Sequence, residues 1–196
     1  MRKFICLIFS FICVAQLSVA QQKKERSTAR LSLKTGLNHH HLSLNGLDEN
    51  NFDSRWKFGY VFGAFVEMKA SENLYFQPEL LYTSMGGRVL KPGNGEDKLR
   101  LNYIAIPLSL KYKICNPFLF STGVQIGWII RAKNGDNDVY SDIKNNEFSL
   151  LGGFEYWIDK KVVLGARYIR GLGNIGYYTD TKAFNEGVQL TIGVKL

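Results

Sequence analysis

The segment LNYIAIPLSLKYKICNPFLFSTGVQIGWII, residues 101–130, consists of two arms that join at Cys115-Asn116-Pro117. On both arms large apolar side chains occupy every second position, and small or polar side chains lie between them. Such strict alternation is typical of β-strands and not of helices. Strands in soluble proteins usually have about five or six residues, whereas a tilted strand needs about 9–11 to cross a bilayer. The segment therefore predicts a hairpin of two strands that are long enough to span a membrane.

The same alternation recurs along the chain and predicts eight strands. They cover about residues 29–37, 58–69, 74–84, 101–114, 118–131, 147–158, 161–170 and 184–196. The connections alternate between long polar segments and turns of a few residues, as in transmembrane barrels that have short periplasmic turns and long outer loops. We therefore predict an all-β fold, an eight-stranded antiparallel up-and-down transmembrane β-barrel.

The first 20 residues have the features of a cleavable signal peptide. Arg2 and Lys3 precede an apolar run, and small residues end at Ala20. The expected domains are thus a signal peptide, residues 1–20, and an outer-membrane β-barrel domain, residues 21–196. After cleavage only Cys115 would remain, so the barrel would form without an internal disulfide.

Charged side chains on the polar faces of the strands are expected to point into the barrel. An eight-stranded barrel is just wide enough to be filled by side chains, and an unpaired charge there would be costly. We therefore predict an internal salt-bridge network with a structural role and no continuous conduction. The lumen-facing charged residues are Lys34, Glu67, Glu79, Lys111, Arg131, Glu155, Arg167 and Lys195.

The net charge of +8 is scattered along the chain. Nucleic-acid binding would require a clustered basic face, so we predict no nucleic-acid partner. Contact with the head groups of outer-membrane lipids is an alternative use of the positive charge.

Several motifs resemble those of a known family. They are QPELLY at 77–82, NYIAIPLSLKY at 102–112, GVQIG at 123–127 and ARYIRGL at 166–172. In their order and spacing the chain resembles the PorT-like outer-membrane β-barrel family of Bacteroidota over essentially all of residues 21–196. The resemblance implies an outer-membrane location, insertion by the barrel-assembly machinery and no defined biochemical activity. The family pattern often has an acidic residue where Ala105 stands here.

His39, His40 and His41 are the three histidines of the chain, and with Asp48, Glu49 and Asp53 they suggest a hydrolytic site only weakly. Neighbouring residues of an extended chain point to opposite sides, and the spacing of the carboxylates completes no metal site. We predict no catalytic, cofactor or metal site, and no enzyme.

The expected function is a structural or surface-binding one, with a protein partner that contacts the outer loops or the periplasmic turns. The alternatives are an accessory component of outer-membrane protein secretion, a loop-based barrel enzyme and a soluble ligand-binding barrel. Pro107 lies within a strand and lacks an amide hydrogen, so we expect a bulge or weakened pairing there.

Overall fold

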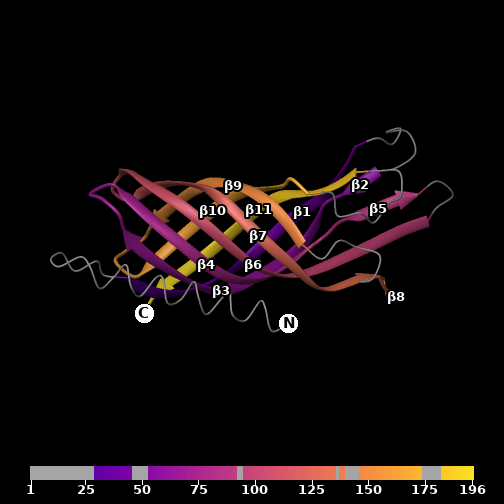
Figure 1. The fold of residues 1–196 in the computed structure, drawn as a ribbon, viewed down its shortest axis with the longest axis horizontal. Coiled ribbons are helices and arrows are strands. Elements are labelled where there is room, and N and C mark those ends of the chain that lie inside the picture. The colour runs from indigo at the N-terminus through magenta and orange to yellow at the C-terminus, as the bar shows by residue number, and fades with distance from the viewer. Residues whose placement is uncertain (1–28, 46–52, 92–94, 136, 140–145, 174–181) are drawn as a thin grey trace.

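The structure, a computed structural model, describes residues 29–45, 53–91, 95–135, 137–139, 146–173 and 182–196. Its body is a closed antiparallel barrel of eight strands, as predicted (Figure 1). The barrel strands are β1 (Arg30–Asn45), β3 (Lys57–Lys69), β4 (Leu74–Met85), β6 (Gly95–Cys115), β7 (Phe118–Asn134), β9 (Asn146–Trp157), β10 (Val162–Gly171) and β11 (Lys182–Lys195). The predicted signal peptide, residues 1–20, lies outside the described residues.

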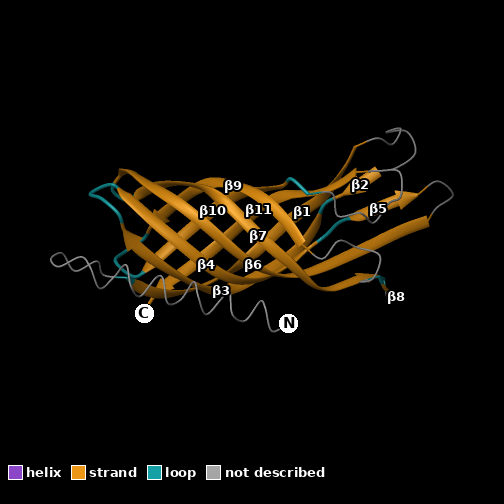
Figure 2. Ribbon diagram, viewed as in Figure 1, coloured by secondary structure: helices purple, strands orange, loops and turns teal. Residues whose placement is uncertain are grey.

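Each barrel strand pairs with a neighbour on both sides. The order around the barrel is β6, β4, β3, β1, β11, β10, β9 and β7, and pairing of β7 with β6 closes the ring. Figure 2 shows that strands make up nearly the whole body and that loops are confined to its ends. Closure satisfies the backbone groups that an open sheet edge would expose, which lipid cannot do.

The two ends of the barrel differ. Tight turns follow β3, β6 and β9 at the end where β1 begins and β11 finishes, and the longer connections leave from the other end (Figure 1). Transmembrane barrels place short turns in the periplasm, so we assign the first end as periplasmic and the second as extracellular. At the extracellular end β2 (Asp53–Arg55) and β5 (Arg88–Lys91) form with the start of β6 a small sheet that projects beyond the barrel. The short strand β8 (Asn137–Asp138) pairs with the end of β7.

The outer surface of the barrel is apolar. Phe62, Leu80 and Leu190 are 50%, 58% and 57% exposed, and apolar side chains of this kind surround the barrel on its strands. Soluble barrels have the opposite arrangement, so the alternative of a soluble ligand-binding barrel is wrong. Among the described residues no helix is long and apolar enough to cross a membrane.

Aromatic side chains cluster toward both ends of this apolar surface. Phe62 stacks on Tyr82 with ring centroids 5.0 Å apart on the extracellular side, and Phe118 packs edge-on against Tyr156 at 5.0 Å on the periplasmic side. Amphipathic aromatic rings prefer the level of the lipid head groups. Their positions agree with a barrel that spans the bilayer between these two levels.

The prediction of a polar loop that begins at Asn38 is wrong, because β1 continues to Asn45. Its pairing with β11 runs without interruption from His39 opposite Val188 to Asn45 opposite Lys182. The strand ladder is held by backbone hydrogen bonds, so it extends past the point where the apolar alternation ends. The three histidines therefore lie on a strand.

The expectation for Pro107 is confirmed in part. The register of β6 and β7 is continuous through Pro107, so no bulge occurs there. On the other side the pairing of β6 with β4 is interrupted between Leu108 and Ala105. A proline donates no hydrogen bond, which explains the weakened pairing.

A bulge does occur nearer the extracellular end, and it reverses one prediction. Asn102 is opposite Arg131, whereas Tyr103 is opposite Ile129, so Ile130 is an extra residue in β7. One extra residue shifts every later side chain to the other face of the sheet. Arg131 is consequently exposed on the outside, and its predicted lumen position is wrong.

Adjacent glycines in β9 provide a test of the barrel's packing. A Cβ atom at Gly153 would collide with the carbonyl oxygen of Ala166 on β10, whereas a Cβ atom at Gly152 would meet nothing within 4 Å. We expect Gly153→Ala to lower the free energy of unfolding by about 1–3 kcal/mol, as overpacking does. Gly152→Ala should change it by less than about 0.5 kcal/mol. Urea unfolding in phospholipid vesicles measures both, and equal effects would contradict the close strand approach.

Candidate functional site

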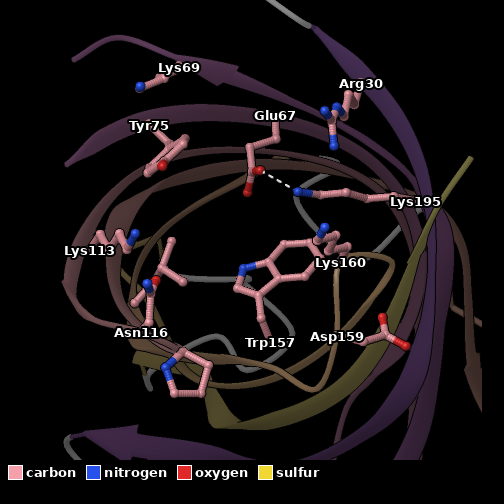
Figure 3. A pocket seen from close by; sticks show the side chains of 12 residues that line it. Arg30, Glu67, Lys69, Tyr75, Lys113, Asn116, Trp157, Asp159, Lys160 and Lys195 are labelled. Carbon is pink, nitrogen blue, oxygen red and sulfur yellow. Dashed lines mark hydrogen bonds and ion pairs between the residues drawn. The ribbon is translucent and has the colours of Figure 1, made fainter. Parts of the chain in front are cut away.

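The interior of the barrel opens at the periplasmic end into a cavity of about 520 Å³ (Figure 3). Its cationic lining residues are Arg30, Lys69, Lys113, Lys160 and Lys195. Glu67 and Asp159 are its carboxylates, and Trp157 lies at its centre in the view of Figure 3. Lys195 Nζ is 3.7 Å from the centroid of the Trp157 ring, within the range of a cation–π contact.

Asp159 lies in the periplasmic turn between β9 and β10. Its Oδ1 accepts hydrogen bonds from the backbone N–H groups of Lys161 and Val162, at 2.6 and 2.7 Å. These bonds favour the charged carboxylate and lower the pKa of Asp159. The carboxylate of Asp159 therefore stabilises the turn that contains it.

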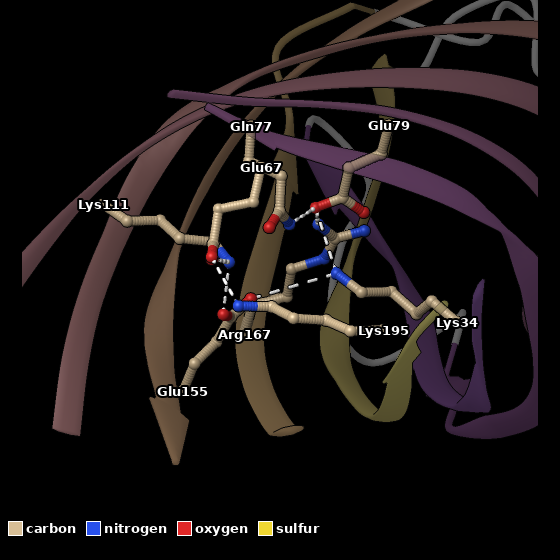
Figure 4. Close-up of polar contacts among 8 residues, drawn as sticks. All are labelled: Lys34, Glu67, Gln77, Glu79, Lys111, Glu155, Arg167 and Lys195. Atoms are coloured by element: carbon tan, nitrogen blue, oxygen red, sulfur yellow. Dashed lines mark hydrogen bonds and ion pairs between the residues drawn. The ribbon is translucent and has the colours of Figure 1, made fainter. Parts of the chain in front are cut away.

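Above the cavity, ion pairs form one chain of alternating charge across the lumen (Figure 4). Lys195 Nζ and Lys111 Nζ lie 2.8 and 3.5 Å from the two carboxylate oxygens of Glu67. Lys111 also pairs with Glu155. In this ion-pair chain each residue pairs with the next in the order Lys195, Glu67, Lys111, Glu155, Lys34, Glu79 and Arg167.

Glu79 is the most heavily engaged carboxylate of this ion-pair chain. Its Oε1 accepts hydrogen bonds from Lys34 Nζ at 3.0 Å, Gln77 Nε2 at 2.7 Å and Arg167 Nη1 at 3.1 Å. The side chain of Glu79 is only 1% exposed. Removal of its charge would leave two buried cations without their closest anion.

Each member of the ion-pair chain comes from a different strand. Seven of the eight barrel strands contribute one residue, and β7 contributes none. These seven residues are those predicted to face the lumen, apart from Arg131, which lies outside. The pairs join strands that are not neighbours in the barrel, and Glu79 on β4 and Arg167 on β10 lie on opposite sides of the ring.

Little open space remains in the lumen at the level of Glu79. The small cavity beside Glu79 and Arg167 has a volume of about 10 Å³, which is about the space of a single water. Toward the extracellular end from there, Val61, Leu81 and Ala105 form a small apolar cluster on the neighbouring strands β3, β4 and β6. Ala105 thus occupies an apolar position where the resemblance implies an acidic residue.

A second polar cluster lies nearer the extracellular end. Tyr103 donates a hydrogen bond of 2.7 Å to Glu147 Oε2, and Asn185 Nδ2 donates to both the Tyr103 hydroxyl and Glu147 Oε2 at 2.8 Å. The large aromatic side chains of Tyr103 and Phe65 are also buried in the lumen. The alternation of the strand predicts the inward position of Phe65, because Phe65 is two residues from both Gly63 and Glu67 and therefore lies on the same face of β3.

The histidines do not converge on one site. His39 stacks on Phe58 at 4.4 Å, and His41 lies 3.3 Å from Glu186, whereas the neighbouring His40 is buried in the interior. Among the described residues no three His, Cys, Asp or Glu side chains are placed to hold a metal. Asp48 and Glu49 lie outside the described residues.

A closed barrel with an apolar outer belt and a charged, filled lumen defines a transmembrane β-barrel of the outer-membrane type. The outer membrane protein beta-barrel domain family matches residues 19–176. The chain belongs to this family, and the protein is located in the outer membrane, where its belt contacts lipid.

Solved structures that resemble the chain include three bacterial proteins. Neisserial surface protein A is 15% identical, with a TM-score of 0.58, 85% of this chain covered and 97% of that chain. Ail, the attachment invasion locus protein of Yersinia pestis, is 10% identical, with a TM-score of 0.48 and coverage of 86% and 99%. OprG from Pseudomonas aeruginosa is 11% identical, with a TM-score of 0.49 and coverage of 87% and 97%. At 15% identity the similarity to Neisserial surface protein A is one of fold alone. No curated protein sequence matches the chain.

Proposed function

We propose that this outer-membrane barrel acts as a surface-binding protein that presents its extracellular extension to a partner. The observation that carries the proposal is the small sheet of β2, β5 and the start of β6, because it continues the barrel wall beyond the membrane (Figure 1). The ion-pair chain fills the lumen beneath the extension, so we infer that the extension does not gate a pore. Neisserial surface protein A, which shares the fold, is by its name also a surface protein.

The finer expectations from the sequence are part of this proposal. We assign residues 1–20 to a cleaved export signal, and we place the chain among the PorT-like barrels of Bacteroidota, inserted by the barrel-assembly machinery. The motifs quoted above support that assignment. An accessory role in protein secretion stays a prediction of the resemblance alone, and we propose no enzymatic activity.

To test the proposal, intact cells that carry the protein in their outer membrane are applied to an array of glycans and soluble proteins. One variant replaces residues 89–97 by a short Gly-Ser linker and so removes most of the extension. A control variant replaces Ser71 and Glu72 of a periplasmic turn by Gly-Ser. We expect cells with the natural or the control protein to bind the same array components, and cells with the shortened protein to lose at least one of them.

Equal amounts of folded barrel, shown by heat-modifiable gel migration, are required for this comparison. Identical array patterns for all three cell types, or no binding by any of them above cells without the protein, would overturn the proposed function.

A further inference from the structure

The periplasmic cavity contains more positive charge than its own carboxylates neutralise. Glu67 is committed to the ion pairs with Lys111 and Lys195, and Asp159 to the backbone of its turn. Arg30, Lys69, Lys113 and Lys160 therefore share a cavity in which neither carboxylate pairs with them.

Arg30, Lys69, Lys113 and Lys160 also have no counter-ion elsewhere in the part of the chain that the structure describes. None of their side chains forms an ion pair within 4.0 Å of a described carboxylate. Like charges around one concave space repel one another and produce a positive potential that attracts an anion. The arrangement is thus one that a bound anion would stabilise.

The size of the cavity and its single opening suit a small ligand. Its volume of about 520 Å³ lies within the range of small-molecule sites, about 300–1,000 Å³. Glu67 and Lys195 of the ion-pair chain line it, and the buried side chain of Lys111 lies next to Glu67. A ligand would enter from the periplasm and stop at the ion-pair chain, so the cavity is a blind-ended site and not a passage.

We propose that this cavity binds a phosphate-bearing ligand from the periplasmic side. A phosphate monoester has about −1.5 to −2 charges at pH 7, which several unpaired cations can match. The guanidinium of Arg30 can donate two parallel hydrogen bonds to phosphate oxygens, and lysine ammonium groups add point charges. Two sources share this chemistry: the head groups of anionic phospholipids in the inner leaflet, and soluble phosphorylated compounds. The inference is independent of the proposed surface binding.

Calorimetric titration with inorganic tripolyphosphate tests the site, with the protein purified from membranes in a nonionic detergent. We expect saturable binding of one tripolyphosphate per barrel, weakened by salt. Arg30→Gln and Lys113→Gln should each weaken binding by roughly three- to tenfold, because each removes one charge-assisted contact from a partly solvated site.

Lys161→Gln is the matched control. Lys161 is exposed in the same turn as Lys160 but does not line the cavity, so its replacement changes the net charge equally. It should weaken tripolyphosphate binding less than about twofold. Heat-modifiable migration confirms that each variant is folded.

Nanodiscs distinguish the two sources of phosphate. Loss of tripolyphosphate binding in phosphatidylglycerol discs but not in phosphatidylcholine discs would support a lipid head group in the cavity, and equal binding in both would support a soluble ligand. The absence of saturable binding in detergent, or a Lys161→Gln effect as large as those of the cavity variants, would overturn the proposal.

Discussion

Replacement of Glu79 by alanine is expected to lower the free energy of unfolding by about 3–5 kcal/mol, the usual cost of breaking a buried ion pair from one side. Glu79 Oε1 accepts hydrogen bonds from both Lys34 and Arg167, and all three side chains are less than 10% exposed. Without the carboxylate, two cations would remain in a lumen from which water is largely excluded. Chemical unfolding in phospholipid vesicles measures the loss.

Two further variants distinguish an uncompensated charge from a packing defect. The triple variant Lys34→Met, Glu79→Met and Arg167→Met removes the charges together, and it should recover most of the stability that Glu79→Ala loses. Glu72→Gln, in an exposed periplasmic turn, should change stability by less than about 0.5 kcal/mol. If the triple variant were less stable than Glu79→Ala, the ion-pair chain would contribute to stability beyond charge compensation, and our explanation would be wrong.

The second large effect concerns the outer belt. Ile192 of β11 is 42% exposed and is opposite Leu164 on β10 and Thr35 on β1, near the middle of the apolar surface. We expect Ile192→Arg to lower the free energy of unfolding in a bilayer by about 2–4 kcal/mol, because an arginine at the midplane must leave water.

The same substitution at the edge of the belt is the control. Leu31 is 52% exposed at the periplasmic start of β1, and Leu31→Arg should cost at most about 1 kcal/mol because the guanidinium can reach the head groups. The ratio of the two losses in unfolding free energy shows how much deeper Ile192 lies in the membrane than Leu31. Equal costs in vesicles would contradict the assignment of this surface to lipid.

Alternation with a period of two was sufficient to predict the eight barrel strands and the faces of most of their side chains. It placed Lys34, Glu79 and Arg167 on the inner face, where the structure has them. It could not reveal which of them meet, because pairs across the lumen depend on the stagger between strands. The single chain of ion pairs across seven strands is therefore a finding of the structure.

The sequence-based errors have local causes. Ile129 and Ile130 are both apolar, so nothing in the alternation indicates that Ile130 is an extra residue and that Arg131 points outward. The strand that contains His39–His41 continues past the apolar pattern because β11 pairs with it. Pattern alone also understated the apolar content of the lumen, where Phe65 and Leu81 pack among the polar residues.

The central claim is that the barrel presents a surface and provides no passage, because the ion-pair chain and the other buried side chains fill the lumen. Conductance across a planar lipid bilayer tests it most directly. After insertion of the folded, purified protein we predict that the current stays at the level of the bare bilayer over the whole range of applied voltage. Stable, stepwise current increases that scale with the number of inserted barrels would show an open lumen and contradict this account.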